Sequence, residues 1–391
     1  MQVTIEHLNW RGEGVGDGKT FRNVLAKEVV DASTGQVLQV SPERIEAFCK
    51  YYERCGGCQL QHWNVAPYQN WKRHLISIAL EKRGIDFPVG EIIDAHGAGR
   101  RRVSLHVRRK DGTIVAGFMA ARSHDLIDID QCPILVPALQ NCTDIARKLG
   151  AKLGDCDVSL TAADNGLDVS IKVERKIADE QMPKLATLVV ELNLARLTIN
   201  GNMVAARTTP VVSIGKALVQ VPPGSFLQAT KVGEETLANL VLASLGKSKS
   251  VADLFCGIGP FALRIAEVAK VTAIDSDKPA IASLAQAVRV TSGIKPLKTE
   301  VRDLVREPMV ANELKEFNAV VFDPPRAGAE AQARQLAKSN VKTIIAVSCD
   351  PASFARDAEI LLSGGYKIRA LTAVDQFKYT SHVETVAAFT R

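Results

Sequence analysis

The clearest indication of the fold is the segment Ser250-Val251-Ala252-Asp253-Leu254-Phe255-Cys256-Gly257-Ile258-Gly259. It begins as an apolar strand over 250–255, turns on two glycines, and leads into an expected helix over 260–269. A strand, a glycine turn and a helix in this order are typical of nucleotide-binding sheets, where ligands bind at the carboxyl ends of strands. The turn has neither the third glycine of the dinucleotide fingerprint nor the Lys-Ser/Thr pair that binds nucleoside triphosphates.

Helices and strands alternate around this stretch, from about Pro223 to the end of the chain. This pattern predicts a doubly wound α/β fold with a mostly parallel sheet. The expected helices cover 231–245, 260–269, 278–290, 329–338 and 351–363, and the expected strands cover 250–255, 271–275, 297–301, 319–322, 343–347, 367–374 and 383–389.

Two carboxylates follow the strands next to the glycine turn. Asp275 ends one strand, where a carboxylate can bind both ribose hydroxyls, and Asp303 follows the next strand, within reach of an adenine amino group. Recognition of ribose and adenine without a phosphate cradle favours S-adenosylmethionine as the cofactor. The alternative is that Gly257 and Gly259 only turn the chain. Cys256 is interpreted as a small residue of that turn.

A cysteine ends another expected strand. Thr343–Ser348 is apolar and β-branched, Cys349 follows it, and Asp350-Pro351 then breaks the strand. A thiol at this position faces the crevice where α/β sheets bind ligands, and Asp323 ends a second strand at the same edge. A lone cysteine is more commonly a small buried hydrophobic residue. Its position at a strand end favours a catalytic role instead.

A thiol beside a methyl donor predicts methylation of a pyrimidine at C5. Addition of the thiolate to C6 makes C5 nucleophilic enough to take the methyl group. A base must then remove the C5 proton before the thiol is eliminated. We expect Cys349 to be the nucleophile and Asp323 to hydrogen-bond the ring edge. Glu384 is the candidate base, and His382 is its rival.

The first half of the chain has a different pattern. Short strands are expected within 1–48, with turns at the glycine-rich 12–18, and a helix is expected over 68–83. Further strands are expected over 102–107, 113–118, 158–162, 167–173 and 197–200, interrupted by one helix near 137–149. Basic residues between Arg100 and Lys110 alternate with valine and leucine, which predicts a strand with one basic face. That face is either solvated or in contact with phosphates.

Four of the eight cysteines form a separate set, Cys49, Cys55, Cys58 and Cys132. Disulfides are not expected in a cytoplasmic chain, so these thiols are interpreted as metal ligands. They suit a structural zinc ion or a [4Fe–4S] cluster. Their spacing matches neither the paired knuckles of zinc ribbons nor the motif of radical enzymes, and Pro133 after the last cysteine favours iron–sulfur.

The length of 391 residues predicts two or three domains, which we place at 1–48, 49–215 and 216–391. The net charge of +6 is mild for a chain of this size. No apolar run approaches the length of a membrane span, and the first residues do not form a secretory signal. We therefore expect a cytoplasmic protein with no membrane partner.

Together these segments resemble the RNA uracil-5-methyltransferase family, in particular its iron–sulfur members that act on 23S ribosomal RNA. The resemblance implies a C-terminal Rossmann-like class I methyltransferase domain, a β-rich central domain and a shortened N-terminal β unit of the TRAM or OB type. The matching stretches are Cys55-Gly56-Gly57-Cys58-Gln59-Leu60-Gln61-His62, Ser225-Phe226-Leu227-Gln228, Asp253–Gly259, Asp323-Pro324-Pro325-Arg326, Val347-Ser348-Cys349-Asp350-Pro351 and Val374-Asp375 with His382-Val383-Glu384.

The resemblance also implies roles for individual residues, with Cys349 as nucleophile and Glu384 as base. The residues implied around S-adenosylmethionine and uracil are Gln228, Phe255, Gly257, Asp275, Asp303 and Asp323, and those implied around a [4Fe–4S] cluster are Cys49, Cys55, Cys58 and Cys132. Two positions depart from the family. Thr230 and Pro260 stand where relatives commonly have asparagine, and neither position carries the chemistry.

The expected function is methylation of one uridine in structured RNA, most consistent with 23S ribosomal RNA, by a monomeric enzyme. A transfer-RNA uridine is the nearest alternative, and the clustered cysteines favour ribosomal RNA over it. A cytosine-C5 enzyme would carry a second cysteine in the segment where this chain has Asp323-Pro324-Pro325-Arg326. A protein of another class, a non-catalytic RNA-binding or ribosome assembly factor on the same fold, remains the alternative to an enzyme.

Overall fold

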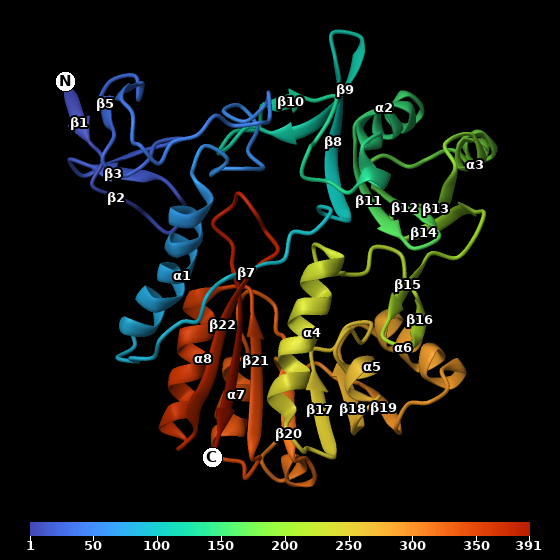
Figure 1. The fold of residues 1–391 in the computed structure, drawn as a ribbon. Coiled ribbons are helices and arrows are strands. Elements are labelled where there is room, and N and C mark those ends of the chain that lie inside the picture. The colour runs from blue at the N-terminus through green and yellow to red at the C-terminus, as the bar shows by residue number, and fades with distance from the viewer.

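A computed structural model describes all 391 residues of the chain, arranged as a small N-terminal β unit, a middle sheet with two helices, and a larger α/β part (Figure 1). The N-terminal unit contains two three-stranded sheets, with strand orders β1-β5-β6 and β2-β3-β4. Its strands are β1 (Gln2–Thr4), β2 (His7–Leu8), β3 (Gly14–Gly16), β4 (Lys19–Phe21), β5 (Val29–Asp31) and β6 (Val37–Gln39).

The glycine cluster of this unit is only partly a turn. Gly12 and Gly18 have positive φ angles, as expected of turns, but Gly14–Gly16 forms strand β3. A Cβ at Gly14 would lie 2.4 Å from Val24, and one at Gly16 would lie 2.4 Å from the carbonyl oxygen of Thr4. These glycines therefore allow close packing of the small sheets, so the expectation of turns throughout this stretch was wrong.

The middle part is a seven-stranded sheet of order β10-β9-β8-β11-β12-β13-β14. Its strands are β8 (Arg102–Lys110), β9 (Thr113–Met119), β10 (Leu126–Asp128), β11 (Cys156–Ala163), β12 (Gly166–Lys172), β13 (Leu194–Ile199) and β14 (Asn202–Ala206). Helices α2 (Cys142–Leu153) and α3 (Met182–Glu191) contribute apolar side chains to its core. The sequence pattern predicted only one helix in this part. Helix α3 and the strands β10 and β14 were not predicted.

The α/β part is built on an eight-stranded sheet of order β19-β18-β17-β20-β21-β23-β22-β7. Strands β17 to β21 are parallel where they pair, and β23 is antiparallel to both of its neighbours. The strands are β17 (Ser250–Leu254), β18 (Lys270–Asp275), β19 (Leu297–Val301), β20 (Ala319–Phe322), β21 (Thr343–Ser348), β22 (Lys367–Asp375), β23 (Glu384–Thr390) and the unexpected edge strand β7 (Ile93–Asp94). The predicted doubly wound sheet is confirmed.

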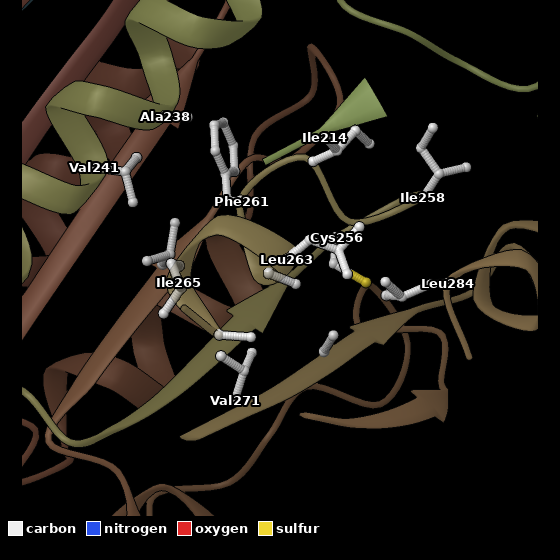
Figure 2. Close-up of a cluster of buried hydrophobic side chains, with 14 of the residues drawn as sticks. Ile214, Ala238, Val241, Cys256, Ile258, Phe261, Leu263, Ile265, Val271 and Leu284 are labelled. Atoms are coloured by element: carbon white, nitrogen blue, oxygen red, sulfur yellow. The ribbon is translucent and has the colours of Figure 1, made fainter. Parts of the chain in front are cut away.

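Apolar side chains cover both faces of this sheet. One face packs against α4 (Lys231–Leu245), α5 (Ala262–Ile265) and α6 (Lys278–Val290). The other packs against α7 (Glu330–Ala337) and α8 (Pro351–Ser363). Figure 2 shows the first core, in which Cys256 lies among apolar side chains such as Leu263 and Leu284. Cys256 is 2% exposed, which agrees with its interpretation as a small buried residue.

Two segments from outside the α/β part complete its core. Helix α1 (Val65–Glu81) lies along α8, and its Ile76 and Leu80 belong to the same apolar cluster (Figure 1). The hairpin of β15 (Val211–Ile214) and β16 (Ala217–Gln220) packs into the opposite core, so the expected boundary at 215 falls in the turn of this hairpin. No helix in the structure is long and apolar enough to span a membrane.

Candidate functional site

The site residues meet at one edge of the eight-stranded sheet, where the parallel strands end. Asp323 follows β20 and Cys349 follows β21. Glu384 reaches the same edge because β23 is antiparallel, so that its first residue lies beside the last residues of β21. Ser348 pairs with Thr385, which brings Cys349 and Glu384 next to each other across the strands.

The glycine turn after β17 has the tight backbone that the sequence indicates. Phe255 has a φ of +61° and Gly257 a φ of +52°, so a non-glycine residue also adopts the left-handed conformation here. Such a conformation is uncommon for a bulky residue and frequent at ligand sites. The carboxylate of Asp275 accepts hydrogen bonds from the amides of Gly257 at 2.9 Å and Asp277 at 2.8 Å. The helix after the turn is shorter than expected, beginning at Ala262.

Asp303 lies near Asp275, but the two residues are not hydrogen-bonded to each other. The amide of Arg302 donates a 2.9 Å hydrogen bond to the carbonyl of Asp275, which brings the two acidic segments side by side. The Asp303 carboxylate accepts from the amide of Val305 at 3.1 Å and is partly exposed. Asp253 lies beneath the turn, fully buried, with no hydrogen-bond partner for either carboxyl oxygen.

A chain of buried polar side chains connects the remaining residues. Gln228 donates from Nε2 to Asp323 Oδ2 at 3.1 Å. Gln376 donates from Nε2 to Gln228 Oε1 at 2.7 Å and to Glu384 Oε1 at 2.9 Å. Gln228, Gln376 and Glu384 are each at most 4% exposed. Gln376 was not identified from the sequence, although it directly follows the motif residue Asp375.

Burial dominates the electrostatics of this site. It raises the pKa of Glu384 to about 8, with the charge of Asp323 adding to the effect. It also raises the pKa of Asp323 to about 7, while the hydrogen bond from Gln228 acts in the opposite direction. The pKa of Cys349 rises to about 12 because of burial and the charges of Glu384 and Asp323. The free protein therefore holds a protonated thiol beside two carboxyl groups that titrate near neutral pH.

His382, the rival base, has a different environment. Burial lowers its pKa to about 4, and its Nε2 lies 3.3 Å from an Arg326 guanidinium nitrogen. The register of β21 with β23 brings Glu384 beside Cys349, whereas the contact of His382 is with Arg326.

The basic strand has only part of the predicted face. Val103, Leu105 and Val107 of β8 are buried, as the alternation predicts. However, Arg101 is also buried, where it pairs with Glu234 at 2.6 Å and supports the backbone of Gln228. Arg102 lies over the ring of Phe226, 5.5 Å from its centre. Phe226 is 67% exposed and lies two residues before Gln228, so its ring forms an exposed surface near the site, with Arg102 half-buried beneath it.

The four clustered cysteines line one cavity of about 150 Å³. Burial raises the pKa of Cys58 to about 11 and of Cys132 to about 12, and neighbouring cysteines raise both further. No three acidic, histidine or cysteine side chains lie close enough together to hold a single metal ion. Arg100 also lines the cavity, and its buried Nε and Nη2 have no hydrogen-bond partner.

The chain is similar to known RNA methyltransferases. The family model described as tRNA (Uracil-5-)-methyltransferase matches residues 124–391. An uncharacterized RNA methyltransferase of Brucella suis is 44% identical over 100% of this chain and 98% of its own length. The 23S rRNA (uracil(1939)-C(5))-methyltransferase RlmD of Chromohalobacter salexigens is 33% identical over 93% of this chain and 80% of its own.

A solved structure shares the whole fold. The crystal structure of Pyrococcus abyssi tRNA (uracil-54, C5)-methyltransferase in complex with S-adenosyl-L-homocysteine superposes with a TM-score of 0.78. The match covers 100% of this chain and 99% of that chain at 21% sequence identity. The predicted fold class is therefore confirmed over the full length.

Proposed function

The chain belongs to the tRNA (uracil-5-)-methyltransferase family, and we propose that it methylates C5 of one uridine in 23S ribosomal RNA with S-adenosylmethionine. The observation that carries this proposal is the meeting of a thiol and two carboxyl groups, from Cys349, Glu384 and Asp323, at one sheet edge beside a glycine turn. The uridine must leave its stack to enter this site, as bases modified in folded RNA do.

The residues have complementary roles in this reaction. The Cys349 thiol gives its proton to the neighbouring Asp323 carboxylate, and the sulfur forms a bond to C6. The C5–C6 electron pair moves to C5, which takes the methyl group, and the sulfonium leaves as a neutral thioether. Glu384 then removes the C5 proton, the C5–C6 double bond re-forms, and the Cys349 thiolate leaves. The raised pKa of Cys349 keeps its thiol protonated in the free protein.

S-adenosylmethionine supplies the methyl group, and the glycine turn fits its nucleoside. Asp275 lies next to the turn and is proposed to bind the ribose, with Asp303 near the adenine. Phe255 and Gly257 shape the backbone of the turn. Gln228 and Asp323 belong to the hydrogen-bonded chain that leads through Gln376 to Glu384. They are proposed to position the methyl donor and the uracil edge.

The four cysteines are proposed to hold a [4Fe–4S] cluster. Four thiolates suit either a zinc ion or a [4Fe–4S] cluster, and Pro133 directly after Cys132 favours iron–sulfur. Because a cluster is larger, its ligands can surround a cavity, as Cys49, Cys55, Cys58 and Cys132 do. Two guanidinium nitrogens of Arg100, Nε and Nη2, lack hydrogen-bond partners at the same cavity, which suits an anionic group. The cluster would stabilise the cysteine loop, and no catalytic step requires it.

RNA contact is proposed for two surfaces. Phe226 offers an exposed ring on which a base can stack, and the Arg102 guanidinium lies over that ring. The N-terminal unit over 1–48, which we interpret as a shortened RNA-binding β unit, carries the exposed Trp10 with Arg11 over its ring.

The proposed domains are 1–48, 49–215 and 216–391. Helix α1 and the β15–β16 hairpin pack on the α/β part.

The choice of RNA rests on the relatives. RlmD acts on 23S rRNA and is 33% identical, whereas the Pyrococcus enzyme that shares the fold acts on tRNA at 21% identity. Nucleoside mass spectrometry on separately purified 23S and transfer RNA, from cells with and without the gene, decides between them. Loss of 5-methyluridine from 23S RNA alone supports the proposal, and loss from transfer RNA identifies the alternative substrate.

A trapping experiment tests the chemistry directly. RNA containing 5-fluorouridine should form a stable covalent complex, because fluorine cannot be removed from C5 as a proton. The complex should persist on a denaturing gel and disappear in Cys349→Ser. Failure of the wild-type protein to form it, with RNA that it binds, would favour a non-catalytic RNA-binding role.

A further inference from the structure

Gln376 occupies the centre of the buried polar chain in the site. Its Nε2 donates to Glu384 Oε1 and to Gln228 Oε1, at 2.9 and 2.7 Å. Its Oε1 accepts a 3.0 Å hydrogen bond from the amide of Ala229. Both the nitrogen and the oxygen of the Gln376 side-chain amide therefore have hydrogen-bond partners. These partners fix the orientation of the amide, with Nε2 as the donor. This side chain is 0% exposed, so no solvent competes for these contacts.

The surroundings of Gln376 hold it in this orientation. Gly233, in the first turn of α4, provides the space, since a Cβ there would lie 2.7 Å from Gln376 Oε1. On one side of Gln376 in the chain, Asp375 is paired with Lys72 of α1. On the other side, the Lys72 ammonium donates to the carbonyl of Phe377 at 3.2 Å. The segment is thus anchored on both sides of Gln376.

We propose that Gln376 is a positioning residue that orients Glu384 for proton removal and Gln228 for cofactor binding through a single amide. This inference deepens the proposed methyl transfer and rests on it. A donor that points at Glu384 stabilises its carboxylate, which is the form that accepts the C5 proton. The same donor leaves the Gln228 Nε2 free to reach Asp323. One residue outside the chemistry would therefore couple the base to the methyl-donor side of the site.

The consequence for the pH dependence follows from the groups around Glu384. The charges of Asp323 and Arg326, after β20, and of Lys72, in α1, act on Glu384, and the Glu384 charge acts on the Cys349 thiol at the end of β21. All four remain in a Gln376 variant, so only the amide donor is lost. Because that donor favours the ionised form, its loss raises the pKa of Glu384 further above its present value. The rising limb of the pH–rate profile then moves to higher pH.

The experiment compares Gln376→Met with Gln332→Met. Methionine has similar length and no comparable donor. Gln332 is a matched control, because it is also 0% exposed and its amide makes two hydrogen bonds to the backbone of Met309, away from the site. Single-turnover rates of 5-methyluridine formation are measured from pH 6 to 10. The denaturing gel shows whether an RNA–protein adduct accumulates with ordinary uridine.

We expect Gln376→Met to lower the turnover rate at neutral pH roughly 10- to 100-fold, as for loss of a hydrogen bond to a charged group. We also expect its pH profile to move to higher pH, the adduct to accumulate, and affinity for S-adenosylmethionine to fall. Gln332→Met should lose thermal stability only. Equal pH profiles and no adduct in Gln376→Met would overturn the inference.

The two hypotheses fail in different ways. If the wild-type protein forms no 5-methyluridine with either RNA, the proposed function is wrong. Calorimetry with S-adenosylmethionine then still tests the contact between Gln376 and Gln228. An affinity that is equal in the wild type and Gln376→Met would refute the positioning role as well.

Discussion

Lys72 and Asp375 form a buried ion pair across 303 residues of sequence, with 2.5 Å between Nζ and Oδ1. Lys72 belongs to α1, which precedes the middle sheet, and Asp375 ends β22 of the α/β part. Tyr68 of the same helix donates to the other Asp375 oxygen at 2.7 Å. Helix α1 is therefore part of the support for the segment that carries Gln376, and it does not act as a linker.

Lys72→Met should be strongly destabilising. Removal of one partner from a buried ion pair leaves an uncompensated charge and costs about 3–5 kcal/mol. The double variant Lys72→Met, Asp375→Asn should recover part of this loss, since it removes the unpaired charge. Denaturation followed by circular dichroism measures both effects. A single variant as stable as the wild type would show that the pair contributes nothing.

Glu384→Gln should separate methyl transfer from product release. The variant keeps Cys349 for the covalent adduct and methyl transfer, but it lacks the proposed base for the C5 proton. Overall turnover should fall roughly 10²- to 10⁴-fold. A covalent RNA–protein complex should accumulate with unmodified RNA, and the second substitution Cys349→Ser should abolish it. Turnover near that of the wild type would show that another residue is the base, and His382 would be the first candidate to test.

Glu384 should also make stability depend on pH. Its pKa is about 8 in the folded protein and 4.5 as the ordinary value. The folded state therefore binds this proton more tightly, so its contribution to stability is complete below about pH 4.5 and is lost as the pH rises to about 8. Glu384→Gln removes this dependence. The Tm of Glu384→Gln minus the Tm of the wild type should become more positive from pH 5 to pH 8. A difference that stays constant over this range would contradict the raised pKa of the buried Glu384 carboxyl.

The cysteine cavity gives a prediction that is independent of activity. Protein purified without oxygen should be brown, with broad absorption near roughly 400 nm. Cys58→Ser should lose the colour and the bound iron, whereas Cys142→Ser should keep both, because Cys142 is buried in the core of the middle sheet. Arg100→Met should retain the four ligands but bleach faster in air. Stoichiometric zinc in colourless wild-type protein would refute the cluster.

Phe226→Ala should weaken RNA binding without changing the fold. Its ring is exposed, so truncation costs little stability, while loss of a stacked base costs about 1–3 kcal/mol of binding free energy. Leu218→Ala, on the β15–β16 hairpin, is the control because Leu218 is also exposed. Filter binding with the RNA identified by mass spectrometry measures both. Equal affinities for the two variants would exclude a stacking role for Phe226.

Regular elements of the α/β part could be predicted well from the sequence. The bounds of α4, α6 and α8 agree with the expected 231–245, 278–290 and 351–363. Each of these helices begins with a side chain that accepts from its first turn, Thr230, Asp277 and Asp350. Such local signals are readable because capping acts between residues close in sequence. Thr230, one of the two departures from the family, thus has a structural role.

The missed features depend on contacts between distant segments. Arg101 was expected to be part of a basic face, but it is buried in an ion pair with Glu234. Gly14 and Gly16 looked like turn residues, yet neighbouring side chains and backbone leave room only for glycine in a strand. The edge strand β7 has two residues, too few for any periodic pattern, and exists only because β22 offers it an edge.

The chemical groups of the site, and the strand ends at which they stand, could be read from the sequence, because apolar patterns and turn residues act locally. Which of these groups touch depends on contacts between distant segments, which arise only in the folded chain. The antiparallel insertion of β23 brings Glu384 beside Cys349, and α1 anchors the segment of Gln376 from 303 residues away. Burial then raises the pKa values of Cys349 and Glu384, since the cost of a charge depends on the surrounding dielectric and not on the neighbours in sequence.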